Sequence, residues 1–289
     1  MFPANFDYVA PRTIDEALTV LAEHGEDAKV LAGGQSLIPL MKLRFAAPAL
    51  IVDINRIDEL KEMIVDESGT LRVGALVRTA ALERSDLLTK SYPTMAAAAP
   101  LISDPIVRNQ GTFVGSLCHA DPQGDWGSVM LALDGAVVAR SAGGTRTIPI
   151  TGFFDGPFST VLRPDELAVE ANVPDPGKRF FGTYLKLERK VGDFATVGVA
   201  VFVATERGVV RRAGIGLTGV GATNIKATEA EQALIGGRLT EAKVKQAAQL
   251  AAAASDPKTD VRGSAEYKRD VVRVFVERGL SQSMAAKAA

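Results

Sequence analysis

Leu31-Ala32-Gly33-Gly34-Gln35-Ser36-Leu37 is the stretch around which this sequence is organised, and it directly follows an apolar run at residues 28–31 that predicts a buried strand. Adjacent glycines at a strand exit leave the backbone free to take positive φ angles and to approach a ligand closely. Successive amides in such a turn form an anion site, and a helix beginning in the apolar run 37–41 would add its positive end. This chemistry suits a pyrophosphate, but an ordinary strand-to-helix turn explains a single Gly-Gly pair equally well.

A second segment of the same character lies at residues 108–122. Its sequence is Arg-Asn-Gln-Gly-Thr-Phe-Val-Gly-Ser-Leu-Cys-His-Ala-Asp-Pro, in which a polar turn with glycines and hydroxyls precedes a run of small residues. Two such loops can offer backbone amides to one anion from opposite sides. We therefore predict that the two loops close around a single phosphate pair.

The composition is typical of a globular protein with a substantial core, because 47% of the 289 residues are hydrophobic and 23% are charged. This length allows two domains of ordinary size or one large one. A formal net charge of -1 without a long basic run gives nucleic-acid binding no electrostatic support. No stretch approaches the roughly 20 apolar residues that span a bilayer. The start lacks the pattern of a secretory signal, so we expect a cytoplasmic protein.

The cysteine and histidine content limits the redox chemistry that the chain can perform by itself. Cys118 is the single cysteine, whereas an iron–sulfur cluster usually takes four thiolates. His24 and His119 lie far apart and show no metal-ligand spacing. If the chain transfers electrons, a bound organic cofactor has to carry them.

Residues 1–55 predict a small α/β lobe with the first loop in its middle. Thr13 and Glu16 form a capping box that begins a helix, and Gly25 ends it. The strand at residues 28–31, the glycine turn and a second apolar strand complete this lobe.

The pattern of residues 56–175 predicts a second lobe, which contains the second loop. Apolar segments with turn signals indicate hairpins within residues 62–76 and 136–150, and a closing strand at 167–173. Apolar residues at helical spacing predict helices at residues 79–88, with Thr79 as a cap, and at 93–101 and 124–133. The segment Pro174-Asp175-Pro176-Gly177 predicts a linker to the next domain.

The remaining residues show a different pattern, in which strands come first and helices follow. Three strands are predicted at residues 180–188, 196–204 and 209–217. Three helices are predicted after them, at residues 228–235, 240–254 and 264–278. An antiparallel sheet followed by a helical layer is an α+β arrangement.

Common nucleotide and catalytic motifs are missing from the sequence. A dinucleotide-binding Rossmann turn needs a third glycine that the first loop lacks, although Asp53 lies about 20 residues further on. No Gly-Lys-Ser/Thr phosphate loop and no Gly-x-Ser-x-Gly hydrolase elbow occurs. Cys118 beside His119 is better explained as a packed thiol and a locally bonded imidazole than as a nucleophile with its base.

Three motifs occur in order along the chain: residues 32–37, residues 108–122, and Tyr184-Leu185-Lys186-Leu187-Glu188-Arg189-Lys190-Val191-Gly192-Asp193-Phe194-Ala195. Together they closely resemble the medium, FAD-binding subunit of molybdenum hydroxylases of the carbon monoxide dehydrogenase and xanthine dehydrogenase family. The likeness covers essentially the whole chain. A stand-alone flavoenzyme resembling UDP-N-acetylenolpyruvoylglucosamine reductase is the alternative within the same superfamily.

The resemblance implies an α+β fold with two domains. Residues 1–175 would form a two-lobed FAD-binding domain of the vanillyl-alcohol-oxidase type, and residues 176–289 would form a three-stranded antiparallel sheet with a helical bundle. Such a subunit takes electrons from the [2Fe-2S] clusters of a small partner subunit and passes them from FAD to an external acceptor. A large molybdenum-cofactor subunit oxidises the substrate, and we expect a dimer of heterotrimers. The alternative is a stand-alone FAD-dependent reductase or oxidase.

The resemblance also implies roles for particular residues. The glycine loops would bind the FAD pyrophosphate. Val114 stands where the family usually has the first of two glycines, so its Cβ is expected to shift the loop and leave Gly115 and the neighbouring amides as donors. The expected cofactor-binding residues are Leu31, Ala32, Gly33, Gly34, Gln35, Ser36, Leu37, Ile102, Gly111, Thr112, Val114, Gly115, Ser116, Asp125, Leu167 and Lys186.

The resemblance implies more specific roles for four side chains in and around the expected site. Asp125 would bond the ribityl or adenosine side of FAD, and the alternative is an acid at a helix N-cap. Lys186 would place a cation near the flavin ring, which would favour the negative charge of the reduced flavin. Tyr184 and Phe194 are the aromatic candidates to cover the ring, although core packing explains either one as well.

Overall fold

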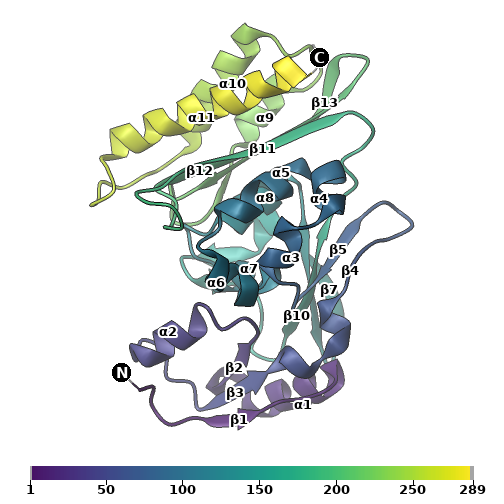
Figure 1. The fold of residues 1–289 in the computed structure, drawn as a ribbon, viewed down its shortest axis with the longest axis vertical. Coiled ribbons are helices and arrows are strands. Elements are labelled where there is room, and N and C mark those ends of the chain that lie inside the picture. The colour runs from purple at the N-terminus through teal and green to yellow at the C-terminus, as the bar shows by residue number, and fades with distance from the viewer. Residues whose placement is uncertain (1, 287–289) are drawn as a thin grey trace.

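The computed structural model describes residues 2–286, and its three parts follow one another along the longest axis in chain order (Figure 1). The last three residues of the predicted C-terminal domain lie outside this range. Within the described residues, no helix has the length and apolar character to cross a membrane.

The N-terminal lobe is a small parallel sheet of order β1-β3-β2 with a helix packed on it. Thr13 caps the helix, because its Oγ accepts the Glu16 amide at 3.1 Å, and Gly25 ends the helix at a φ of 51°. The predicted helix and both predicted strands are therefore present. The elements are β1 (Asp7–Val9), α1 (Ile14–His24), β2 (Ala28–Leu31), α2 (Leu37–Lys42) and β3 (Leu50–Asp53).

The middle lobe contains a five-stranded antiparallel sheet of order β4-β5-β10-β6-β7. Its strands are β4 (Met63–Val65), β5 (Leu71–Gly74), β6 (Ala136–Ser141), β7 (Gly144–Pro149) and β10 (Leu167–Val173). Two short strands, β8 (Phe154–Gly156) and β9 (Ser159–Thr160), form a separate pair. Both predicted hairpins and the closing strand are confirmed.

Short helices connect and cover this sheet: α3 (Thr79–Glu83), α4 (Asp86–Ser91), α5 (Pro93–Ala98), α6 (Pro105–Gln110), α7 (Phe113–His119) and α8 (Asp125–Ala132). The prediction of one helix over residues 79–88 with Thr79 as its cap is wrong. The N-cap of α3 is Arg78, and Thr79 is a buried helical residue. Ser85 begins a second helix, since its Oγ accepts the Leu88 amide. A polar side chain that competes for backbone amides explains the break.

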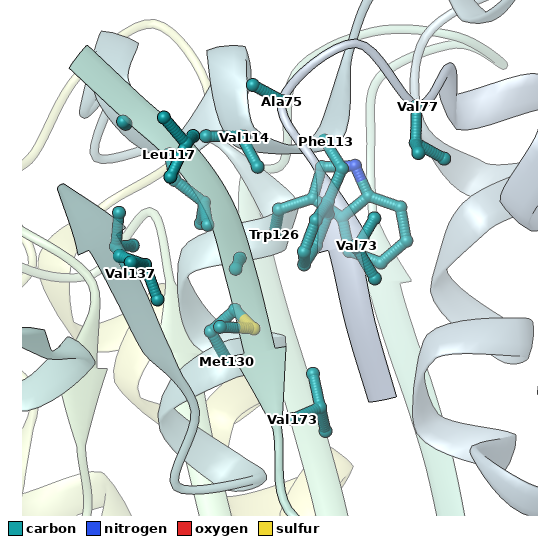
Figure 2. Close-up of a cluster of buried hydrophobic side chains, with 14 of the residues drawn as sticks. Val73, Ala75, Val77, Phe113, Val114, Leu117, Trp126, Met130, Val137 and Val173 are labelled. Atoms are coloured by element: carbon teal, nitrogen blue, oxygen red, sulfur yellow. The ribbon is translucent and has the colours of Figure 1, made fainter. Parts of the chain in front are cut away.

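The core of the middle lobe lies between its sheet and the helices α7 and α8 (Figure 2). Phe113 and Trp126 meet edge to face at its centre, with ring centroids 4.8 Å apart. Val114 is 1% exposed and belongs to the same cluster as these rings. The first turns of α7 and α8 are thus anchored by fully buried side chains, which fixes the backbone positions of the residues around them.

The C-terminal part is a sheet between two helical layers (Figure 1). The three predicted strands, β11 (Phe180–Leu187), β12 (Val197–Glu206) and β13 (Val209–Thr218), are present. A fourth strand of two residues, β14 (Ile225–Lys226), joins the edge, so the expected three-stranded sheet has four strands. So short a strand has no alternating pattern for sequence analysis to detect. The helices are α9 (Thr228–Leu234), α10 (Glu241–Ala254) and α11 (Ala265–Ala286).

Strand β12 explains why this sheet is buried on both faces. Val197, Val199 and Val201 pack with α9, α10 and α11, whereas Ala200 and Phe202 belong to the core of the middle lobe. Successive side chains of a strand point to opposite faces, so one uninterrupted apolar run serves both layers. The sheet therefore packs against the helical bundle on one face and against the helices α5 and α8 of the middle lobe on the other.

Candidate functional site

The first glycine loop leaves the end of β2 and enters α2 after Ser36. Gly34 has a φ of 71°, which favours glycine at this position. The amides of residues 33–36 donate to no acceptor within the described part of the chain. They remain as a row of donors beside the first turn of α2, as the anion-site prediction requires.

The second glycine segment differs from the predicted loop. Only Gly111 and Thr112 lie between helices, and residues 113–116 form the first turn of α7. Thr112 is the N-cap, and its Oγ accepts the Gly115 amide at 3.1 Å. The expectation that Gly115 would be a principal free donor is therefore wrong, because its amide is already used by the cap.

The Val114 side chain belongs to the hydrophobic core. It is buried in the core shown in Figure 2, and so it packs on the side of α7 that contacts the sheet. Val114 also lines the cavity described below. A valine is accommodated here because the core takes up its methyl groups.

The two glycine segments lie directly against each other. A Cβ on Gly33 would be 2.8 Å from Gly111 Cα and 3.0 Å from the Thr112 amide nitrogen, and closer still to the Gln110 carbonyl oxygen. Such approaches are too short for any side chain, so only glycine fits at residue 33. The two distant turns therefore lie side by side, as a shared phosphate site requires, and the binding of a phosphate pair between them stays a prediction.

A polar bridge that the sequence analysis missed links both segments. The Asn55 side-chain amide donates to the Ala32 carbonyl at 2.7 Å, and Arg78 Nη2 donates to Asn55 Oδ1 at 2.6 Å. The other terminal nitrogen of Arg78 donates to the Gln110 carbonyl. Asn55 therefore holds the first segment while Arg78 holds the second. Both residues lie outside any recognisable motif, so no local signal identifies them.

Around these turns lies a cavity of ≈ 960 Å³. Every residue expected from the sequence to bind the cofactor lines it, from Leu31 on the first loop to Leu167 on β10 and Lys186 on β11. The volume is at the upper end of the ~300–1,000 Å³ typical of small-molecule sites. A cavity of this size, with a glycine cradle that a Cβ would fill, fits an extended dinucleotide.

A buried ion pair forms one wall of the cavity. Asp125 accepts the Tyr184 hydroxyl at 2.6 Å and the Lys186 ammonium at 2.9 Å, and Lys186 also donates to the Leu101 carbonyl at 2.8 Å. The Lys186 side chain is 2% exposed. Desolvation raises the pKa of Asp125, and the charge of Lys186 opposes that shift. Asp125 is the first residue of α8 after the N-cap Gly124, so the N-cap alternative is wrong.

Lys186 is predicted to place a cation near the flavin ring, and the structure shows which carboxylates face that cation. Its ammonium faces Asp125 directly and lies 3.6 Å from Glu188 Oε2. Two carboxylates therefore compensate its charge, and it does not present an unpaired positive charge to the cavity. A carboxylate has about four lone-pair sites, so Asp125 can still accept hydrogen bonds from a ligand.

The two aromatic candidates have different positions. Tyr184 is 3% exposed, and burial together with Asp125 raises its pKa well above the ordinary value. It belongs to the core rather than to the cavity wall, so its candidacy as a cover for the ring is wrong. Phe194 lines the cavity and is 51% exposed.

Arg108 is a further residue whose role the sequence analysis missed. Its guanidinium forms a bidentate pair with Glu83 on α3, at 2.8 and 3.1 Å. It also donates to the carbonyls of Ile102 and Ser103, which lie on the cavity wall. Arg108 begins the second motif, so its presence was visible in the sequence, but its long-range partners were not.

His119 and Cys118 line the same cavity without forming a nucleophilic pair. Burial lowers the pKa of His119 below its ordinary value of 6.5, and its ring packs against Phe158 with centroids 5.4 Å apart. Desolvation raises the pKa of the partly buried Cys118 thiol to about 12. A thiol with such a pKa is a poor nucleophile, in agreement with the packed-thiol interpretation.

Comparisons with known proteins agree with this geometry. Residues 4–176 match the model of the FAD binding domain in molybdopterin dehydrogenase, and residues 182–283 match the CO dehydrogenase flavoprotein C-terminal domain. The carbon monoxide dehydrogenase medium chain of Hydrogenophaga pseudoflava is 39% identical over 285 residues, covering 99% of both chains. The 6-hydroxypseudooxynicotine dehydrogenase complex subunit alpha of Paenarthrobacter nicotinovorans is 40% identical over 285 residues, covering 98% of this chain and 96% of that one.

A solved structure shows the same fold. The structure of carbon monoxide dehydrogenase from Hydrogenophaga pseudoflava, in a form lacking the Mo-pyranopterin moiety, superimposes with a TM-score of 0.94 at 41% identity and covers 99% of both chains. These matches confirm the resemblance drawn from the three motifs, and they confirm FAD as the cofactor and an oxidoreductase subunit as the type of protein. The chain therefore belongs to the family of FAD-binding medium subunits of multi-subunit molybdenum hydroxylases, which includes carbon monoxide dehydrogenase and xanthine dehydrogenase.

Proposed function

We propose that residues 32–36 and 111–116 hold the pyrophosphate of FAD between them. This proposal rests on the close contact of Gly33 with the backbone of residues 110–112 in the wall of the cavity. The unpaired amides of the first loop supply donors, and the Thr112 and Val114 amides at the start of α7 supply more. Donors from two directions match the two phosphate groups of a dinucleotide.

The remaining residues on the cavity wall hold the other parts of the cofactor in this proposal. Asp125 accepts hydroxyl donors with the lone pairs that Lys186 and Tyr184 leave free. Ile102 and Leu167 provide apolar contacts, and Phe194 covers the ring system. When bound, FAD supplies the electron-carrying chemistry that side chains cannot provide.

In the assembled enzyme we propose that this chain receives electrons from [2Fe-2S] clusters of a small subunit and delivers them to an external acceptor. A large subunit with the molybdenum cofactor oxidises the carbon substrate, and the complex is a dimer of heterotrimers. Relatives named as medium chains or complex subunits support this assignment. The chain itself divides near residue 175, after β10, into an FAD-binding domain and a C-terminal domain.

The proposal is tested by purifying the full-length chain alone and recording its visible spectrum. We expect a yellow protein that releases one FAD per chain on denaturation and that does not turn over the carbon substrate of the complex. Addition of a reduced small subunit with its clusters should bleach the flavin spectrum. A colourless chain that does not take up FAD would contradict the cofactor site, whereas turnover of a small organic substrate by the chain alone would favour the stand-alone enzyme.

A further inference from the structure

The connector between β11 and β12 contributes residues to the cavity wall. Gly192, Asp193 and Phe194 line the cavity, and half of the Phe194 surface remains exposed. The neighbouring Val191 is 94% exposed. A connector with so few buried side chains needs other contacts to keep Phe194 in one place.

Those contacts come from the C-terminal helical bundle. Arg262, on the loop between α10 and α11, donates from Nη1 to the Phe194 carbonyl at 2.9 Å and from Nη2 to Asp193 Oδ1 at 3.3 Å. The same carboxylate oxygen accepts the Phe194 amide at 2.8 Å. The side chains of Arg262 and Asp193 are 15% and 19% exposed, so water screens this pair only partly. One guanidinium therefore holds both the backbone and the acid beside the aromatic residue.

The loop that carries Arg262 is itself fixed. Asp260 Oδ1 accepts the Arg262 amide at 2.8 Å, and Asp260 Oδ2 pairs with Lys268 at 2.7 Å. Lys268 lies on α11 with a side chain 3% exposed, and it also donates to the Lys258 carbonyl at 2.9 Å. A buried lysine in the long helix thus positions the loop, and the loop positions Arg262.

The connector is also supported from the other side. Gly192 has a φ of 86°, and a Cβ there would lie 3.3 Å from the carbonyl carbon and oxygen of Ser103. The Ser103 carbonyl is in turn held by Arg108 at 2.9 Å. The connector is therefore held between the middle lobe and the C-terminal bundle.

We propose that Arg262 is a positioning residue that holds the Asp193–Phe194 segment so that the Phe194 ring covers the ring system of the bound FAD. This inference rests on the proposed function and adds a role for the C-terminal bundle at the cofactor site. An exposed phenyl ring gains by packing against a planar heterocycle. Holding that ring in place before binding reduces the ordering cost of the complex.

The test compares two ligands on the full-length apo chain. ADP has the adenosine and pyrophosphate of FAD but no flavin ring, so it reports the glycine cradle and the adenosine contacts without those of the ring. We expect Arg262→Ala to weaken FAD binding about tenfold, which is the loss of roughly one charge-assisted hydrogen bond, and to change ADP binding less than about twofold. Arg262→Lys should recover part of the affinity, because an ammonium can still reach one acceptor.

Three further variants complete the test of whether Arg262 acts through Phe194. Arg211→Ala is the matched control, since Arg211 pairs with Glu206 in an exposed ion pair on another hairpin. In a double-mutant cycle, Arg262→Ala should have little additional effect on FAD binding when Phe194 is already alanine. Asp193→Asn, which removes the charge of one partner only, should weaken FAD binding in the same direction but less.

Hydrogen exchange measures the order of the connector without any ligand. Hydrogen exchange of the amides around residues 191–194 should become faster in Arg262→Ala and remain unchanged in Arg211→Ala. Equal losses for FAD and ADP, or additive effects of Arg262→Ala and Phe194→Ala, would overturn the inference while leaving the proposed function intact. A wild-type chain that binds neither ligand would overturn the proposed function, and this inference with it.

Discussion

Replacement of Gly33 by alanine tests the central geometry of the site. The new Cβ would lie 2.8 Å from Gly111 Cα, whereas carbon atoms in contact are about 3.5 Å apart, so the two glycine segments have to separate by roughly 0.7 Å. Neither segment can yield easily, because Arg78 and Asn55 hold both backbones. Overpacking of this kind costs about 1–3 kcal/mol of unfolding free energy.

Gly33→Ala should also weaken the binding of FAD, and this change should be proportionally larger than the change in the unfolding free energy. A displacement of this size lengthens hydrogen bonds that have an optimum near 2.9 Å, and each bond to a charged phosphate contributes about 1.5–3 kcal/mol. Loss of one such bond predicts that the Kd for FAD rises about 10- to 100-fold. Isothermal titration of the apo chain measures this constant, and a denaturant melt measures the stability.

The matched control is Gly152→Ala, because a Cβ on Gly152 would meet no atom within 4 Å. This variant should bind FAD with wild-type affinity. If Gly33→Ala also bound FAD within about twofold of the wild type and melted at the same denaturant concentration, the two glycine segments could not form the pyrophosphate cradle described above.

Three further predictions concern the wall of the cavity. Asp125→Asn leaves the buried Lys186 ammonium with Glu188, 3.6 Å away, as its remaining carboxylate, and it should lower the unfolding free energy in urea by up to about 3–5 kcal/mol. Asp58→Asn, in an exposed ion pair, should change the unfolding free energy by less than about 0.5 kcal/mol. Burial lowers the pKa of His119 in the folded chain, so on acidification the unfolded state takes up the proton first. The unfolding free energy should therefore decrease as the pH drops below about 6.5, and this decrease should be smaller in His119→Gln. The Cys118 thiol, with a pKa of about 12, should resist a thiol reagent at pH 8 in the folded chain and react once per chain in urea; rapid labelling of the folded protein would contradict its desolvation.

Local sequence patterns predicted most of the fold. The capping box at Thr13, the glycine stop at Gly25 and the apolar runs marked the first lobe, and the turn signals marked both hairpins of the second. Such signals act within a few residues of one another, so they can be read from the chain directly. The errors have the same origin: Ser85 began a new helix where apolar spacing suggested one continuous helix, and the two residues of β14 were too few to form a pattern.

The sequence by itself determined which residues could form the site: two side-chain-poor turns, the acid Asp125 and the lysine Lys186. Only the tertiary structure decided how they are used. It placed Gly33 against residues 110–112, paired Lys186 with Asp125, and brought Arg262 to Phe194 across 68 positions of the chain. The physical reason is that charge compensation and close backbone contact depend on distances between elements, and these distances follow from the packing of whole layers rather than from the spacing of residues along a strand or helix.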